Sequence, residues 1–128
     1  MELSYRKERD EDFLSICESI RKEYGKVYIS MEDIAKKAVY QEAKSFYLNE
    51  KVYAIIIQNV RIGRLEYVRF NYKRELYMEI YNRYIKLKRE NPSLTIMNCA
   101  RIISDQKAPR FYISEGRAAN LYYELIKK

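Results

Sequence analysis

The side chains best suited to specific recognition lie near the C-terminal end of the chain. Arg117, Asn120, Glu124 and Lys127 occupy positions i, i+3, i+7 and i+10, so a helix over 115–127 would carry them on one polar face. Arginine pairs well with the edge of guanine, and asparagine with the edge of adenine. The spacing therefore predicts a face on which Arg117 and Asn120 could read bases, with an ordinary solvated face as the alternative.

The residues just before this helix could contact phosphate groups. Backbone N–H groups at the start of a helix bind anions, and the side chains there would add to them. The predicted phosphate contacts at this turn are Lys107, Arg110, Tyr112 and Ser114, and Arg101, Lys73 and Arg74 would widen the surface. Glu115 argues against this, because an acid at a helix start repels phosphate, although it also suits the helix dipole.

The composition argues against several kinds of chemistry. The chain has no histidine, which removes the commonest general base and the commonest metal ligand. Cys17 and Cys99 are the only cysteines, too few for a disulfide framework or a metal cluster, and both lie in apolar helical registers. We expect two buried thiols, no metal, no cofactor, no small-molecule substrate and no enzymatic activity.

An internal repeat organises the sequence. At an offset of 65 residues the segments 41–54 and 106–119 share identical residues at six positions. The pairs are Gln41/Gln106, Ala43/Ala108, Phe46/Phe111, Tyr47/Tyr112, Glu50/Glu115 and Ala54/Ala119. Repeated aromatics of this kind favour a buried plug at each turn over base-stacking platforms. The repeat predicts two copies of one helical unit.

Apolar residues at helical spacing, with capping residues before them, predict the elements. We expect helices over about 10–24, 31–40, 50–60, 74–90, 96–105 and 115–127, with Ser30, Asn49, Thr95 and Ser114 as N-caps. Met1 to Arg9 is expected to fray. The sequence thus predicts an all-α fold of about six helices, a tandem duplication of a three-helix unit that is helix-turn-helix-like in outline. The connection of about eight residues is longer than the three or four of that motif.

The two copies differ in polarity. Positions 52–57 are almost entirely apolar, so the helix over 50–60 should be internal, packed against the second copy or a second chain. We therefore expect residues 1–60 to form a scaffold copy, 61–74 a basic linker and 75–128 a basic copy.

The net charge of +7 is unevenly distributed. Residues 1–60 hold 10 Lys/Arg and 11 Asp/Glu, whereas residues 61–128 hold 15 and 7. A basic half favours a polyanionic partner, and nucleic acid is the first candidate. Within it, residues 61–74 combine five basic residues with one acid and several aromatics, which fits either a solvated linker or a basic arm that follows a phosphate backbone.

The chain shows no signal for a membrane. Its longest apolar run, Val52 to Ile57, has six residues, and the charged residues from Arg6 to Asp12 leave no room for the apolar core of a signal peptide. We expect a cytoplasmic protein without a membrane partner.

One segment also resembles a known family. The run Pro109-Arg110-Phe111-Tyr112-Ile113-Ser114 is similar to the "PRFYVS" segment near the C-terminus of short uncharacterised bacterial proteins, with Ile113 as the only departure. The resemblance covers about residues 75–128. It implies a helical, helix-turn-helix-like and DNA-binding character, and no defined activity.

Two functional hypotheses follow. In the first, this is a small DNA-binding protein, a regulator or accessory factor, that uses the second helical unit. In the second, it is an all-α interaction module or homodimeric adaptor without nucleic-acid binding, because tyrosine is enriched at protein interfaces and the chain has 14 tyrosines.

Overall fold

The computed structural model describes residues 3–127. The helices are α1 (Leu3–Tyr24), α2 (Met31–Val39), α3 (Glu50–Arg61), the short 3₁₀ helix η1 (Arg64–Tyr67), α4 (Asn71–Glu90), α5 (Ile96–Ser104) and α6 (Glu115–Ile126). Within the described part no strand forms, and the only β-type pairing is a single bridge between Ala43 and Ala108. For residues 3–127 the predicted all-α fold of about six helices is confirmed. None of the described helices has the length and apolarity needed to cross a bilayer.

Each predicted N-cap residue begins its helix. Ser30, Asn49, Thr95 and Ser114 all have extended backbone angles, and each side chain accepts a hydrogen bond from a backbone N–H of the first turn. Thr95 and Asn98 form a reciprocal capping box. These contacts satisfy N–H groups that a helix start leaves without a partner, which is why the starts of α2, α3, α5 and α6 were predictable.

The start of α1 was predicted wrongly. The helix runs from Leu3 rather than from about residue 10, so residues 3–9 are helical and not a frayed lead. Residues 1–2 of the predicted lead lie outside the described residues. Asp10, Glu11 and Asp12 therefore lie inside the helix and do not complement its N-terminal dipole. Asp12 is instead buried, with 6% of its surface exposed.

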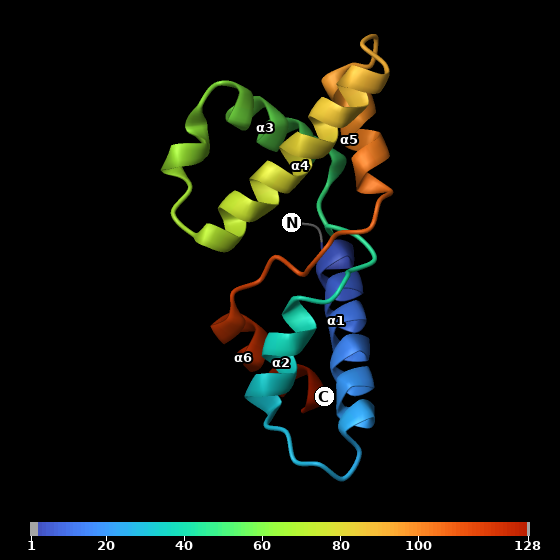
Figure 1. Ribbon diagram of the computed structural model, residues 1–128, viewed down its shortest axis with the longest axis vertical. Coiled ribbons are helices and arrows are strands. Elements are labelled where there is room, and N and C mark those ends of the chain that lie inside the picture. Colours follow the sequence, from blue (N-terminus) through green and yellow to red (C-terminus); the bar gives the residue numbers. More distant parts are fainter. Residues whose placement is uncertain (1–2, 128) are drawn as a thin grey trace. The chain divides into compact units, whose positions relative to one another are not determined.

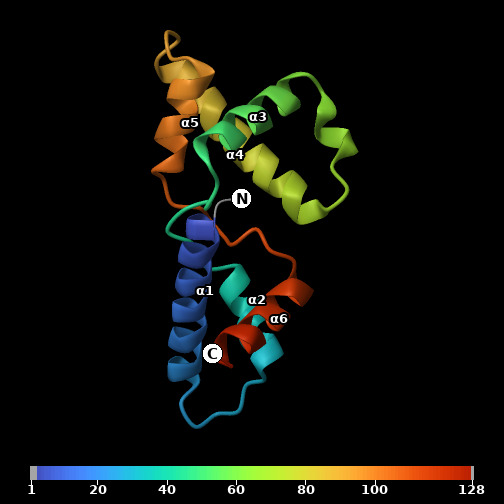
Figure 2. The ribbon, with the colours of Figure 1, turned by 180° about the vertical axis from the view of Figure 1, so that it is seen from behind.

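The chain forms two compact units. The first, Leu48–Gln106, contains α3, α4 and α5 and is called the α3–α5 unit below. The second contains the described residues up to Tyr47 and from Lys107 onward, and is called the α1–α2–α6 unit. Figures 1 and 2 show α3 beside α4 and α5, and α6 beside α1 and α2. These units are not the predicted ranges 1–60 and 75–128, because each takes its third helix from the other half of the chain.

Each unit has its own apolar core. In the α3–α5 unit the buried helical side chains are Tyr53, Ile56, Ile57, Ile80, Tyr84, Cys99, Ala100 and Ile103. In the α1–α2–α6 unit they are Phe13, Cys17, Ile20, Ile34, Ala35, Ala38, Val39, Ala118, Leu121 and Tyr122. Most belong to the apolar faces that the 3.6-residue period predicted.

The helix α3 is less enclosed than its composition predicted. It packs against α4 and α5, which belong to the second half of the chain as expected. However, Ile55 and Ile62 remain 58% and 52% exposed. An apolar sequence on all sides therefore did not produce a helix buried on all sides within its unit.

Candidate nucleic-acid interface

The nine predicted contact residues divide between the two units. Lys73, Arg74 and Arg101 belong to the α3–α5 unit, and Lys107, Arg110, Tyr112, Ser114, Arg117 and Asn120 belong to the α1–α2–α6 unit. The two groups are therefore described separately, each with the contacts of its own unit.

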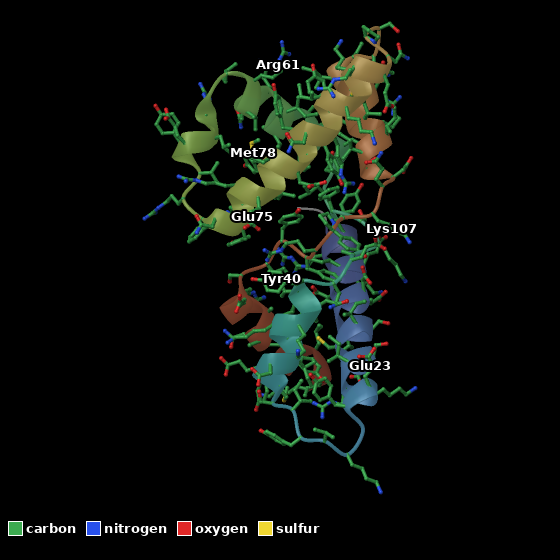
Figure 3. All side chains as sticks on the ribbon, in the orientation of Figure 1. Glu23, Tyr40, Arg61, Glu75, Met78 and Lys107 are labelled. Atoms are coloured by element: carbon green, nitrogen blue, oxygen red, sulfur yellow. The ribbon has the colours of Figure 1, made fainter. Side chains whose placement is uncertain are left out.

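Arg110 is held by its own turn. Its Nε donates to the carbonyl of Phe111 at 3.0 Å, and its Nη2 donates to the carbonyl of Ile113 at 3.1 Å. Its guanidinium carbon lies 4.6 Å from the ring centroid of Tyr40 and 5.4 Å from that of Tyr112; Tyr40 is labelled in Figure 3. The planar cation thus stabilises the connection before α6 by hydrogen bonds and ring contacts. A phosphate would compete with these contacts.

Three neighbours are also engaged in local structure. Ser114 Oγ accepts the N–H of Arg117 at 3.2 Å as the N-cap of α6. The ring of Tyr112 stacks on that of Phe46 with 5.9 Å between centroids. Lys107, labelled in Figure 3, places its Nζ 3.5 Å from a carboxylate oxygen of Glu42. The aromatics Phe46, Phe111 and Tyr47 are buried and Tyr112 is half-buried, so the expected aromatic plug is present.

The predicted polar face of α6 is on the surface but carries both signs of charge. Arg117, Asn120, Glu124 and Lys127 are all exposed. Arg117 Nη1 lies 3.5 Å from Glu124 Oε1, and Glu115 accepts a hydrogen bond from Tyr40 at 2.7 Å. Arg101, in the other unit, is exposed and 3.9 Å from Glu50. Exposed pairs like these contribute little stability, but the acids weaken the local attraction for a polyanion.

The segment 61–74, called the basic arm below, carries mainly positive charge, unlike the polar face of α6. It comprises the end of α3, the helix η1 and the first residues of α4. All five of its basic residues, Arg61, Arg64, Arg69, Lys73 and Arg74, are exposed, against the single acid Glu66. Figure 3 labels Arg61 at the end of α3 where the arm begins. The arm therefore has a net charge of +4 over 14 residues, from five basic residues and one acid.

Two features give the basic arm a defined backbone. Gly63 has φ of 80°, a left-handed angle that favours glycine, and it lies between the C-cap of α3 and the start of η1. Arg74 then holds the loop, because its Nε donates to the carbonyl of Val68 at 2.6 Å and its Nη2 to that of Glu66 at 3.2 Å. Arg74, which was predicted as a phosphate contact, thus also stabilises this loop.

The net charges of the two units differ in the same direction, because the unit that contains the basic arm is the more positive one. The α3–α5 unit, residues 48–106, holds 11 Lys/Arg and 6 Asp/Glu, a net charge of +5. The rest of the chain holds 14 and 12, a net charge of +2. The basic surface thus belongs mainly to the unit that lacks α6.

One buried polar cluster was not predicted. Asp12 accepts hydrogen bonds from the backbone N–H of Lys44 at 3.0 Å and from the hydroxyl of Tyr47. Tyr47 has φ of 59°, which costs a non-glycine residue free energy, and its N–H donates to Ser45 Oγ. Burial, followed by the hydrogen bond to Asp12, raises the pKa of Tyr47. A clue in the sequence was that Asp12 lies four residues before Ile16, at the spacing that places both side chains on one face of the helix.

The two thiols are buried, as expected. Neither Cys17 nor Cys99 is in a disulfide. Burial raises the pKa of Cys17 to about 12 and also raises that of Cys99. Since the thiolate is the nucleophile and the metal ligand, these side chains act as small apolar residues.

Comparisons with known proteins add no further constraint. No family model, no curated protein and no solved structure matches the chain. Among the described residues no group of three or more His, Cys, Asp or Glu side chains could hold a metal ion.

Proposed function

We propose that this is a small DNA-binding protein, a regulator or accessory factor, whose main contact surface is the basic arm, residues 61–74. The observation that carries the proposal is the exposure of all five basic residues of the arm beside a single acid. Lys and Arg that neutralise phosphates release counterions from DNA, and this term supplies most sequence-independent affinity. In this proposal the protein is cytoplasmic and not an enzyme.

The choice of the arm over α6 follows from how the cations are used. Arg110 is bound by two carbonyls and lies near two rings, and Arg117 lies against Glu124. By contrast, Arg61, Arg64 and Arg69 are exposed, and no acid among residues 3–127 is seen to form an ion pair with them. The arm thus offers cations to phosphates at less cost in lost protein contacts.

Fluorescence anisotropy with a short labelled DNA duplex tests this. We expect binding that weakens steeply between about 50 and 200 mM salt. Replacing Arg61, Arg64, Arg69 and Lys73 together by Gln should lower affinity at least about tenfold and flatten the salt dependence, since each lost phosphate contact removes about 0.9 from the slope for duplex DNA. Arg74 is left in place because it holds the loop.

A matched control removes the same charge elsewhere. Lys7, Lys22, Lys26 and Lys36 are four exposed lysines of the α1–α2–α6 unit. Their joint replacement by Gln should change duplex affinity by less than about threefold, because the charge that is lost lies outside the arm. Equal losses in both variants would show that net charge, and not the arm, attracts DNA, and the proposed site would be wrong.

The second candidate is a protein-interaction module, and one observation favours it. Ile55 of α3 and Ile62, the C-cap residue of that helix, are each more than half exposed, which is costly for an apolar side chain. A homodimer or protein partner could cover this face. Sedimentation at rising concentration separates the two candidates: a dimer lost on Ile55→Asp, together with no affinity for DNA, would favour the second.

We also propose that the chain is a tandem duplication. α2 and α5 each have nine residues and α3 and α6 each have twelve, and in both pairs the starts are 65 residues apart. This is the offset at which the identical residues recur. The match in length, spacing and capping supports one ancestral three-helix unit.

A further inference from the structure

We propose that the basic arm binds single-stranded nucleic acid by stacking unpaired bases on Tyr67 and Phe70. The inference depends on the proposed function and adds the class of ligand to it. It starts from two large rings that the fold leaves uncovered: 76% of Tyr67 and 53% of Phe70 is exposed. Both lie within the arm, where cations flank them in sequence on either side.

The rings are presented by an ordered segment. Tyr67 is the last residue of η1, and Phe70 occupies the N-cap position of α4. The guanidinium of Arg74 bonds to the carbonyls of Glu66 and Val68, next to Tyr67 in the chain. The backbone between the two rings is therefore tied to the first turn of α4, so the rings need little further ordering when a ligand binds.

Phe70 already makes the two kinds of contact that a bound nucleotide would also make, ring stacking and a nearby cation. Its ring stacks on Tyr72 at 5.8 Å between centroids with 27° between the planes. Lys73 Nζ lies 5.5 Å from the centre of the Phe70 ring. A flat ring with one face on another aromatic and a cation nearby suits a nucleobase that carries its own phosphate.

This chemistry favours a single strand over a duplex. In a duplex the bases are stacked on one another, whereas an unpaired base can offer its face to an aromatic side chain. The cations Arg64 and Arg69 would follow the backbone of the same strand. A membrane surface also takes aromatic and basic residues, but it needs a broader apolar face, and here Arg69 separates Val68 from Phe70.

The test compares three labelled probes on the full chain by fluorescence anisotropy. These are oligothymidine, an abasic oligomer with the same number of phosphates, and the duplex of that length. We expect oligothymidine to bind at least about tenfold more tightly than the abasic oligomer, because stacking on one ring already contributes roughly that factor per base. Binding to the duplex should resemble that to the abasic oligomer at equal salt.

The variant Tyr67→Ala/Phe70→Ala should abolish the preference for bases and leave the abasic affinity unchanged. Tyr28, which is 87% exposed in the other unit, provides the matched control, and Tyr28→Ala should keep the preference. Circular dichroism and urea unfolding would test whether the variants fold.

Each other outcome is decisive. Equal binding of all three probes would overturn base stacking and leave the proposed DNA binding intact. Absence of binding to any probe at low salt would overturn both. Binding to anionic lipid vesicles with no preference for bases would assign the rings to a membrane surface and overturn this inference.

Discussion

Ala43 and Ala108 exchange two backbone hydrogen bonds, with N–O distances of 2.9 and 3.0 Å. They are 65 residues apart, at equivalent positions of the two sequence repeats. The connections that contain them lead to the third helices: the chain passes from α2 through Ala43 to α3, and from α5 through Ala108 to α6. The pairing therefore joins the two connections through which the chain passes from one unit to the other, before α3 and before α6.

This exchange predicts the behaviour of a cut chain. A site-specific protease sequence inserted after Gly63 would separate α1, α2 and α3 from α4, α5 and α6. We expect the two pieces to remain associated, because α3 buries Tyr53 and Ile57 in the α3–α5 unit and α6 buries Tyr122 in the other. Because the pieces have 63 and 65 residues apart from the insert, size-exclusion chromatography in native buffer should give the mass of the uncut chain, and in denaturing buffer about half of it. A native peak at about half the mass of the uncut chain would contradict the observed packing of the third helices.

The docking of α6 can be tested with two adjacent tyrosines. Tyr122 is fully buried and accepts a hydrogen bond from Arg21 Nε at 3.1 Å, whereas Tyr123 is 52% exposed. We expect Tyr122→Ala to lower the free energy of unfolding by about 3–5 kcal/mol, and Tyr123→Ala by less than about 1 kcal/mol. Urea unfolding measures both. Similar losses would mean that α6 does not pack through this face.

Arg110 is predicted to be a structural residue. Lysine cannot reproduce the planar contact with the Phe111 and Ile113 carbonyls, so Arg110→Lys should lower the free energy of unfolding by about 1–2 kcal/mol. Arg117→Lys, on the exposed face of α6, should change it by less than about 0.5 kcal/mol. Urea unfolding gives the stabilities, and anisotropy should show duplex affinity unchanged in both. A loss of DNA affinity without a loss of stability in Arg110→Lys would return this residue to the contact surface.

The buried pair of Asp12 and Tyr47 predicts an alkaline limit to stability. Burial and the hydrogen bond raise the pKa of Tyr47 above the ordinary value of about 10. The stability from this group is therefore complete below about pH 10, where the unfolded phenol is also neutral. It is lost as the pH rises toward the folded pKa, because the unfolded state then releases a proton that the folded state retains.

Comparing the protein with Tyr47→Phe isolates this effect from the other tyrosines. At neutral pH the variant should be less stable by about 1–3 kcal/mol, since Asp12 loses a buried donor. Above about pH 10 the difference in unfolding free energy should shrink. A difference that stays constant from pH 7 to about pH 11 would show that Tyr47 is not protected in the folded state.

Local signals made most helices predictable. A capping side chain and the first buried residues lie within one or two turns, so Ser30, Asn49, Thr95 and Ser114 indicated four helix starts without knowledge of the fold. The same reasoning gave a wrong start for α1, which begins at Leu3. The acids from Asp10 to Asp12 resemble a first turn, but Asp12 is used from the helix interior to accept hydrogen bonds from Lys44 and Tyr47.

The candidate site was less predictable than the fold. An arginine that bonds to carbonyls, such as Arg110, and one exposed to solvent, such as Arg69, look the same in a sequence. Their roles depend on which backbone atoms the tertiary fold brings within about 3 Å. The polar face of α6 was predicted from the helical period. That Glu115 accepts a hydrogen bond from Tyr40 and that Glu124 lies against Arg117 depends on the tertiary structure and could not be predicted.

The sequence by itself determined the approximate positions of α2 to α6, which face of each is apolar, and that positive charge concentrates after residue 60. These properties follow from short-range hydrogen bonds and from the helical period. Only the tertiary structure decided that α3 completes the unit of α4 and α5 while α6 completes that of α1 and α2. Equivalent third helices bury similar faces, so the choice between them depends on long-range packing that no local pattern encodes.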